Sequence, residues 1–253
     1  EAHRMYTMGD VALCSEENED LLYRLFGKNA ELLIDHAWGW EPCTIEAIKA
    51  YKPGTHSISV GQVLQSPYPN DKAKLVLREM TDGLVLDLVD KGLVTDQVVL
   101  TVGYDIENQG YSGEMETDRY GRRVPKQAHG SINLGEYTSS TQAVMRAVET
   151  LFDRIVNKKL AVRRMYVVAN HILREEDAQK KPERQQLDFF TDYAAEAKER
   201  AAKKAAQDKE RRVQEALIGI RHKFGKNAIL RGMNLEEGAT ARQRNAQIGG
   251  HKA

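Results

Sequence analysis

Two adjacent arginines, Arg163 and Arg164, stand at the start of an apolar run that continues to residue 172. If this run is a β-strand, the alternation of side chains places one arginine on a face of the sheet and the other toward its edge. Basic side chains bind phosphate groups, and the hydroxyls of Ser57 and Ser59 can donate hydrogen bonds to phosphates as well. These residues together predict a surface that contacts the phosphate backbone of a nucleic acid.

A loop rich in glycine and charge, residues 105–128, supplies further candidates. Its basic side chains are Arg119, Arg122, Arg123 and Lys126. Beside the end of a sheet, they would enlarge a phosphate-binding surface. The same loop carries three alternating carboxylates, Glu114, Glu116 and Asp118. Because carboxylates on a glycine-rich loop are usually solvated, we expect no metal site here.

Motifs for phosphate loops and catalytic metals are absent from the sequence. It contains neither GxxxxGK[ST] nor GxGxxG, and its seven histidines show no HExxH or other paired spacing. We therefore predict no catalytic residue, no metal ligand and no cofactor in this chain.

The composition is balanced, with 37 basic and 37 acidic residues and a formal net charge of zero. This balance does not exclude a nucleic-acid partner, because phosphates meet one face of a protein and not its average charge. Cys14 and Cys43 lack CxxC spacing and are expected to be reduced thiols. No apolar run could span a bilayer, and no signal peptide opens the chain. We expect a cytoplasmic protein without a membrane partner, truncated at its N-terminus because it begins at Glu1.

Apolar periodicity predicts the element order βαββαβ over residues 56–173. The expected strands cover residues 56–66, 97–104, 129–137 and 161–172, and the expected helices cover residues 70–92 and 140–158. Each helix has one apolar stripe, so both can cover one face of a four-stranded sheet and leave the other face open. In the first strand, Gly61 marks a bulge or a close backbone approach. The predicted fold class is α+β.

Short helices are expected before this domain, in residues 1–50. Thr7 and Asp10 match a capping box at the first helix. Ser15 is expected to cap a second helix and Asn29 a third. Three short helices cannot form a stable domain alone, so they are expected to belong to a larger one. After the domain, residues 193–212 predict a solvated polar helix, and disorder or packing against a partner is expected for the tail.

An apolar island interrupts the charged linker that follows the last strand. Its residues are Gln186, Leu187, Asp188, Phe189 and Phe190. Three large apolar side chains have no local core to enter here, so the segment either folds back on the domain or inserts into a partner's pocket. We predict that it binds a partner protein as a peptide, with the glutamine fixing its register.

These segments together resemble the C-terminal half of a Y-family translesion DNA polymerase of the bacterial branch. Residues 7–12, TMGDVA, are similar to the T-x-G-D-x-A sequence of the helical thumb, and residues 57–61, SISVG, to the K-S-x-G opening of the little-finger domain. Residues 163–164 match the position of paired basic residues that contact template phosphates. Residues 186–190 resemble the bacterial sliding-clamp motif Q-L-[S/D]-L-F, with Phe189 in place of leucine.

The resemblance implies a thumb remnant in residues 1–50, a little-finger DNA-binding domain in residues 51–174 and a clamp-binding tail in residues 175–253. It implies translesion synthesis and DNA repair in the SOS response, with primer–template DNA and the replication sliding clamp as partners. The implied DNA-binding residues are Ser57, Ser59, Gly61, Arg122, Arg123, Arg163 and Arg164. The palm carboxylates that hold Mg²⁺ for nucleotidyl transfer are missing from this chain, so the fragment is expected to be inactive alone.

Two other functions stay open. An RNA-binding module has the same βαββαβ order, but it stacks bases on aromatic residues of its third strand, where residues 130–134, GSINL, offer none. A structural or regulatory α+β domain would bind no nucleic acid, so salt-dependent DNA binding distinguishes it from the first function.

Overall fold

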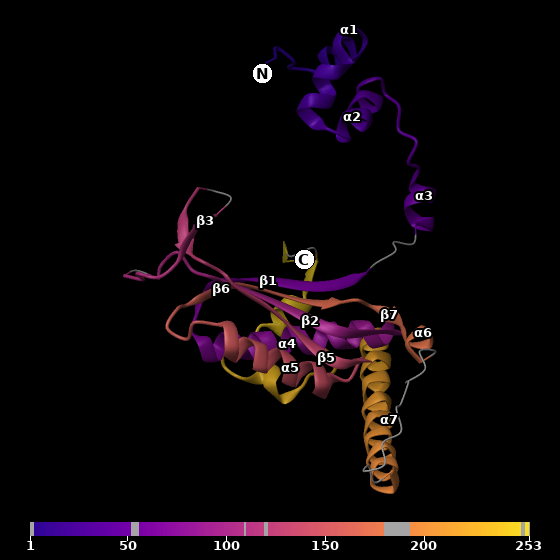
Figure 1. Ribbon diagram of the computed structural model, residues 1–253, viewed down its shortest axis with the longest axis vertical. Coiled ribbons are helices and arrows are strands. Elements are labelled where there is room, and N and C mark those ends of the chain that lie inside the picture. Colours follow the sequence, from indigo (N-terminus) through magenta and orange to yellow (C-terminus); the bar gives the residue numbers. More distant parts are fainter. Residues whose placement is uncertain are drawn as a thin grey trace. The chain divides into compact units, whose positions relative to one another are not determined.

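The computed structural model describes residues 3–51, 56–108, 110–118, 121–179, 193–248 and 251–252. The chain divides into two compact units, residues 1–54 and residues 55–253 (Figure 1). The first is helical and the second contains the main sheet, so the predicted α+β class is confirmed. Within the described ranges, no helix has the length and apolar character needed to cross a membrane.

The N-terminal unit contains the helices α1 (Met8–Phe26), α2 (Asn29–Ala37) and α3 (Ile45–Ala50). The predicted capping box is present at α1. The Thr7 hydroxyl accepts from the Asp10 amide at 3.2 Å, and the Asp10 carboxylate accepts from the Thr7 amide at 2.8 Å. Few described residues of this unit are buried, namely Val11, Ala12, Leu22 and Ala30. Cys14 and Cys43 are free thiols.

The predicted helix start at Ser15 is wrong. The Ser15 hydroxyl donates to the Ala12 carbonyl at 2.6 Å inside α1. The helix kinks instead at Asn18, whose φ of −155° and ψ of 64° are not helical. Asn29 does not cap α2 either, because Lys28 occupies the N-cap position. A serine can satisfy its hydroxyl by bonding back to a carbonyl in its own helix, so residue type alone does not mark a helix start.

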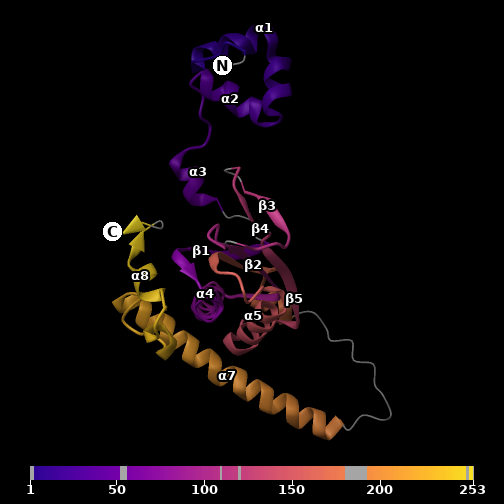
Figure 2. The ribbon, with the colours of Figure 1, turned by 90° about the vertical axis from the view of Figure 1, so that its left-hand side faces the viewer.

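The second unit is built on an antiparallel sheet in the order β1–β6–β2–β5. Its strands are β1 (Ser57–Tyr68), β2 (Leu93–Tyr104), β5 (Ala128–Thr138) and β6 (Val162–Asn170). The helices α4 (Asn70–Asp90) and α5 (Thr141–Ile155) lie together on one face, as Figures 1 and 2 show. The predicted βαββαβ order is therefore confirmed. A short strand β7 (Leu173–Arg174) pairs with β2 and leads into α6 (Glu175–Gln179).

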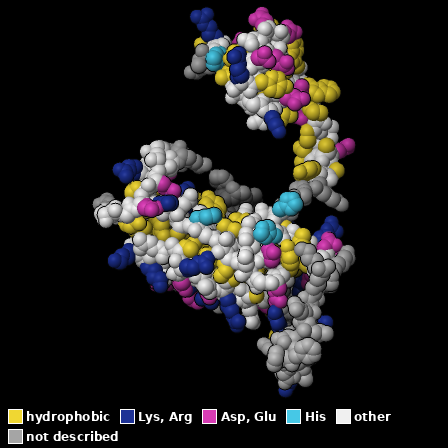
Figure 3. All heavy atoms as spheres, viewed as in Figure 1, with side chains coloured by type: hydrophobic (Ala, Val, Ile, Leu, Met, Phe, Trp, Pro, Cys, Tyr) yellow, Lys and Arg dark blue, Asp and Glu magenta, His cyan; other side chains and the backbone are white. Residues whose placement is uncertain are grey.

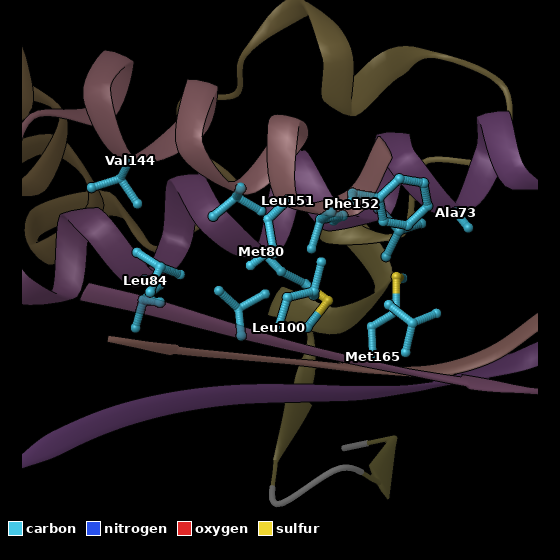
Figure 4. Close-up of a cluster of buried hydrophobic side chains, with 14 of the residues drawn as sticks. Ala73, Met80, Leu84, Leu100, Val144, Leu151, Phe152 and Met165 are labelled. Atoms are coloured by element: carbon cyan, nitrogen blue, oxygen red, sulfur yellow. The ribbon is translucent and has the colours of Figure 1, made fainter. Parts of the chain in front are cut away.

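The core lies between the sheet and the two helices. On β6, Met165, Val167 and Ala169 are buried, whereas Tyr166 is 41% exposed on the other face. The core residues labelled in Figure 4 are Ala73, Met80, Leu84, Leu100, Val144, Leu151, Phe152 and Met165. Burying a large apolar side chain is worth about 1.5–3 kcal/mol, so this cluster holds both helices against one face of the sheet.

The predicted loop over residues 105–128 contains a short hairpin of β3 (Met115–Thr117) and β4 (Arg123–Pro125). Both views of the ribbon place this hairpin on the side of the sheet away from α4 and α5 (Figures 1 and 2). It therefore stands beside the uncovered face.

The described part of the C-terminal segment packs on its own domain, unlike the expected disorder or packing against a partner. The helix α7 (Tyr193–Phe224) is exposed over residues 201–209, as predicted, but buries Gln214. The Gln214 amide donates to the Ser139 carbonyl and the Thr141 hydroxyl, both at 2.9 Å. The later elements are the 3₁₀ helix η1 (Gly232–Leu235), α8 (Ala241–Asn245), β8 (Gln247–Ile248) and β9 (His251–Lys252).

A buried carboxylate on α4, Glu79, holds the end of this segment. It is 2% exposed. It accepts hydrogen bonds from Asn234 Nδ2 at 2.8 Å and from the backbone amides of Thr240 and Ala241 at 2.7 and 3.1 Å. Because a buried carboxylate is costly without such partners, the C-terminal segment is an integral part of the folded unit.

A second buried carboxylate, Asp82, lies one turn further along α4. It is 3% exposed and accepts a hydrogen bond from Arg231 Nε at 2.6 Å. Burial raises the pKa of the Asp82 carboxyl above its ordinary value of 3.8, although Arg231 and Arg221 oppose this change. The desolvation of the carboxylate thus outweighs its attraction to the two arginines.

Candidate nucleic-acid interface

Among the described elements of this unit, no helix covers the face of the sheet away from α4 and α5, and the strand registers arrange the side chains of this face in rows. The rows are Ser57, Asn170, Gln97 and Asn133; then Ser59, Val168, Val99 and Ser131; then Gly61, Tyr166, Thr101 and His129; and last Val63, Arg164 and Gly103. We call this surface the open face. The two serines, the glycine and one arginine of the predicted DNA-binding set therefore share one surface.

Two glycines allow side chains from β6 to lie flat on the open face. A Cβ atom at Gly61 would stand 2.5 Å from two ring carbons of Tyr166, so the ring lies over β1. A Cβ atom at Gly103 would stand 2.5 Å from Nε of Arg164, whose side chain lies over β2. Only glycine permits such close approaches. The sequence predicted a bulge or a close backbone approach at Gly61, but the group that approaches it is the Tyr166 side chain, and the register shift of β1 lies further along, between Val63 and Tyr68.

Side-chain amides link three strands at one end of the open face. Asn170 Nδ2 donates to Gln97 Oε1 at 3.1 Å, and Gln97 Nε2 donates to Asn133 Oδ1 at 2.9 Å. Further along, Thr101 Oγ1 and His129 Nδ1 lie 2.8 Å apart. Each amide group retains a second N–H donor, so this row is oriented by its internal bonds and can still bind a ligand.

The open face carries no negative charge. No Asp or Glu occupies its four rows. On the helix-covered side, basic and acidic side chains are interspersed (Figure 3), and they pair, as Lys74 does with Asp153 at 2.7 Å and Arg78 with Glu149 at 3.1 Å. The open face is therefore distinguished by the lack of carboxylates, which would repel a phosphate backbone.

A comparison with known families matches residues 55–189 to the C-terminal domain of the impB/mucB/samB family. The match covers more than half of the chain and includes all four strands that form the open face. The chain belongs to this family. The resemblance to Y-family translesion polymerases is thereby confirmed for this C-terminal region.

A curated relative of this impB/mucB/samB chain is UvrX of Bacillus subtilis (strain 168), a protein named for UV-damage repair. The two sequences are 26% identical over 235 residues, an alignment that covers 92% of this chain and 47% of the relative. The chain thus spans about half the length of this relative.

Within the impB/mucB/samB domain, Arg163 does not lie on the open face beside Arg164. The strand β6 carries an extra residue opposite the end of β2, so Arg163 sits in a β-bulge. Its Nη1 donates to the Gln65 carbonyl at 3.0 Å, and its Nε lies 3.6 Å from the Asp105 carboxylate. Its side chain therefore joins edge strand β1 to the loop after β2.

Most described basic residues of the β3–β4 hairpin are ion-paired. Arg122 lies 2.7 Å from the Asp118 carboxylate, and Lys126 lies 2.7 Å from the Glu114 carboxylate. Arg123 lies in β4 and is exposed. A phosphate would have to compete with these carboxylates for Arg122 and Lys126, so the hairpin contributes less free positive charge than its sequence predicts.

The three hairpin carboxylates have separate partners, since Glu116 accepts from the Gln127 amide at 3.3 Å. Across the part of the chain that the structure describes, no three His, Cys, Asp or Glu side chains come together as a metal ion requires. These residues do not fit a Mg²⁺ site, so no step of nucleotidyl transfer is assigned to them.

Two predicted elements lie outside the described residues, namely Arg119 and the peptide of residues 186–190. Their roles stay predictions. Conversely, the sequence reasoning missed several residues of the open face: Gln97, Thr101, His129, Asn133, Tyr166 and Asn170. The available signal was alternation, because each adjoins at least one residue that faces the helices.

Proposed function

We propose that this chain is the DNA-binding region of a Y-family polymerase that acts in translesion synthesis and DNA repair. Its open face binds the phosphate backbone of primer–template DNA. Membership in the impB/mucB/samB family and the relative named for UV-damage repair support the repair role. The observation that carries the proposal is the carboxylate-free open face, with Arg164 extended across Gly103.

Different residues of the open face make different contacts with the DNA. Arg164 supplies a positive charge on the inner strand β6, and the hydroxyls of Ser57 and Ser59 supply neutral donors on edge strand β1. The amides of Gln97 and Asn133 are linked to one another, and their remaining N–H donors can bind phosphate oxygens. The contacts therefore go to phosphates, and the affinity is expected to be similar for unrelated sequences.

A charge placed on the open face tests this proposal. Ser59→Asp puts a carboxylate among the proposed phosphate contacts, and Thr150→Asp puts the same charge on the exposed side of α5. Fluorescence anisotropy with a labelled primer–template duplex is expected to show roughly tenfold weaker binding for Ser59→Asp, because like charges repel at the interface. Thr150→Asp is expected to bind nearly as the wild type does. Equal losses in the two variants, or none, would contradict the proposal.

We also propose that catalysis and its Mg²⁺ ions belong to a part of the polymerase outside these residues. The aligned region covers only 47% of the curated relative, and its remaining length gives room for a catalytic part. Residues 186–190 are proposed to bind the replication sliding clamp as an extended peptide. The chain alone is then expected to bind DNA and the clamp without extending a primer.

The alternative function, single-stranded RNA binding, gains support from Tyr166. This aromatic residue is 41% exposed on a central strand, and exposed aromatic rings can stack on unpaired bases. Tyr166→Ala separates the two functions. If binding to single-stranded RNA exceeds binding to duplex DNA and is lost in this variant, the chain is a single-strand binder.

A further inference from the structure

A cavity of about 530 Å³ lies where the C-terminal segment meets edge strand β1. β1 lines it with Gly61, Gln62 and Val63 among others, and the C-terminal segment lines it with Gln243 and Arg244. Figure 2 shows this segment running along α4 and past the edge of β1. Gly61 and Val63 also belong to the open face, so the cavity adjoins that surface.

The charge in this cavity is positive and unpaired. Among the described residues that line it, Arg244 alone is charged. Its Nη1 donates to Gln62 Oε1 at 2.9 Å, and no carboxylate in the described ranges lies within 4.0 Å of its guanidinium. Burial lowers the pKa of the Arg244 guanidinium, and its attraction to the Glu79 carboxylate opposes this change. A partly buried cation without a carboxylate at ion-pair distance can still bind an anionic ligand.

The fold holds Arg244 in place. Gln62 Nε2 donates to the Thr240 hydroxyl at 2.9 Å, and Glu79 accepts from the amides of Thr240 and Ala241 at the start of α8. The helix that carries Arg244 is thus fixed to both β1 and α4. A cation positioned before its ligand arrives loses less conformational entropy on binding.

We propose that this cavity binds a phosphate group of the nucleic-acid backbone through Arg244. The inference rests on the proposed function and extends the interface from the open face across the edge of β1 to the C-terminal segment. Gly61 and Val63 line the cavity from edge strand β1, so a backbone that leaves the open face across this edge can approach Arg244. The cavity thereby adds a phosphate contact beyond the matched family region, which ends at residue 189.

The test compares variants of the full chain with a labelled primer–template duplex over a range of salt concentrations. Arg244→Gln is expected to weaken binding roughly tenfold, because a charge-assisted hydrogen bond is lost. The slope of log affinity against log salt concentration is expected to fall by about 0.9. Gln243→Glu changes an exposed residue of α8 and leaves the Glu79 contacts intact. It is expected to weaken binding by repelling the phosphate.

Arg146→Gln is the matched control, because it removes the same charge from the exposed side of α5. It is expected to leave the affinity within about twofold of wild type. Thermal unfolding checks the fold of each variant, and Gln243→Glu keeps the test decisive if Arg244→Gln does not fold.

Three outcomes separate the proposals. In the first outcome, the wild type binds DNA and Arg164→Ala weakens this binding, but Arg244→Gln and Gln243→Glu bind DNA as the wild type does. The cavity assignment is then overturned and the proposed function stands. If wild type binds no DNA, the proposed function fails. If inorganic phosphate raises the unfolding temperature of wild type but not of Arg244→Gln, while DNA affinity is equal for both, the ligand is a free anion and the nucleic-acid assignment is overturned.

Discussion

Two neighbouring arginines have different environments and therefore different expected roles. Arg164→Ala is expected to lower the salt slope of DNA binding by about one, because one phosphate contact is lost from the open face. Arg163→Ala is expected to leave that slope unchanged and to lower the unfolding free energy by about 1 kcal/mol, because its bond to the Gln65 carbonyl is lost. Anisotropy at several salt concentrations and urea unfolding measure the two quantities. Equal slope changes in both variants would show that Arg163 also contacts DNA.

Gly61 is expected to be intolerant of a side chain because of Tyr166. Gly61→Ala places Cβ 2.5 Å from the Tyr166 ring, which must swing away from β1. We expect a loss of about 1–2 kcal/mol in unfolding free energy, as for other overpacked sites. In a Tyr166→Ala background, Gly61→Ala is expected to lower the unfolding free energy by less than it does in the wild type. Urea unfolding of the double variant, compared with that of Tyr166→Ala, measures this difference. Additive losses would mean that the ring is not the obstacle.

At the level of elements, the contact between α4 and the C-terminal segment is expected to depend on pH. Because burial raises the Asp82 pKa above 3.8, the folded chain binds this proton more tightly than the unfolded chain. The contribution of Asp82 to the unfolding free energy therefore rises as pH falls through the raised pKa toward 3.8. Asp82→Asn lacks this titration. Urea unfolding between about pH 7 and pH 4 should show wild type gaining stability relative to Asp82→Asn as pH falls. A constant or opposite difference would contradict the assignment.

The periodicity of the sequence was sufficient to predict the four long strands and two helices of the main domain, because each carries a recurrent apolar stripe or face. Helix α4 is also buried beyond that stripe, where the C-terminal segment covers Glu79 and Asp82. It also predicted the open face, since alternation separates Ser57 and Ser59 from the core. The bulge at Arg163 was beyond such reasoning, because a bulge depends on which strand lies opposite. The partners of Glu79 were equally out of reach. The local sequence predicts a solvated carboxylate on the helix, because the residues that bind Glu79 lie 155 to 162 positions later in the chain.

At the level of the whole molecule, residues 186–190 are expected to bind the sliding clamp. Burying Leu187, Phe189 and Phe190 is worth roughly 1.5–3 kcal/mol each before ordering costs, which suggests affinity on the order of micromolar. Titrating the clamp with a peptide of residues 181–193 measures this affinity. The control peptide has Gln186, Leu187 and Phe190 changed to alanine and is expected not to bind. Equal binding by both peptides, or no binding by the native one, would indicate that the segment has another role.

The hydrogen bonds from Glu79 to the C-terminal segment also bear on the order in which the domain is completed during translation. The Ala241 amide lies 162 residues beyond Glu79. At ribosomal rates of about 5–20 residues per second, α4 waits roughly 8–30 s for this partner. The strand β6, which joins β1 to β2, also emerges late in the chain. A nascent chain therefore has α4 long before it has either β6 or the residues that cover its carboxylates. The open face and the Arg244 cavity are thus among the last features of the domain to form.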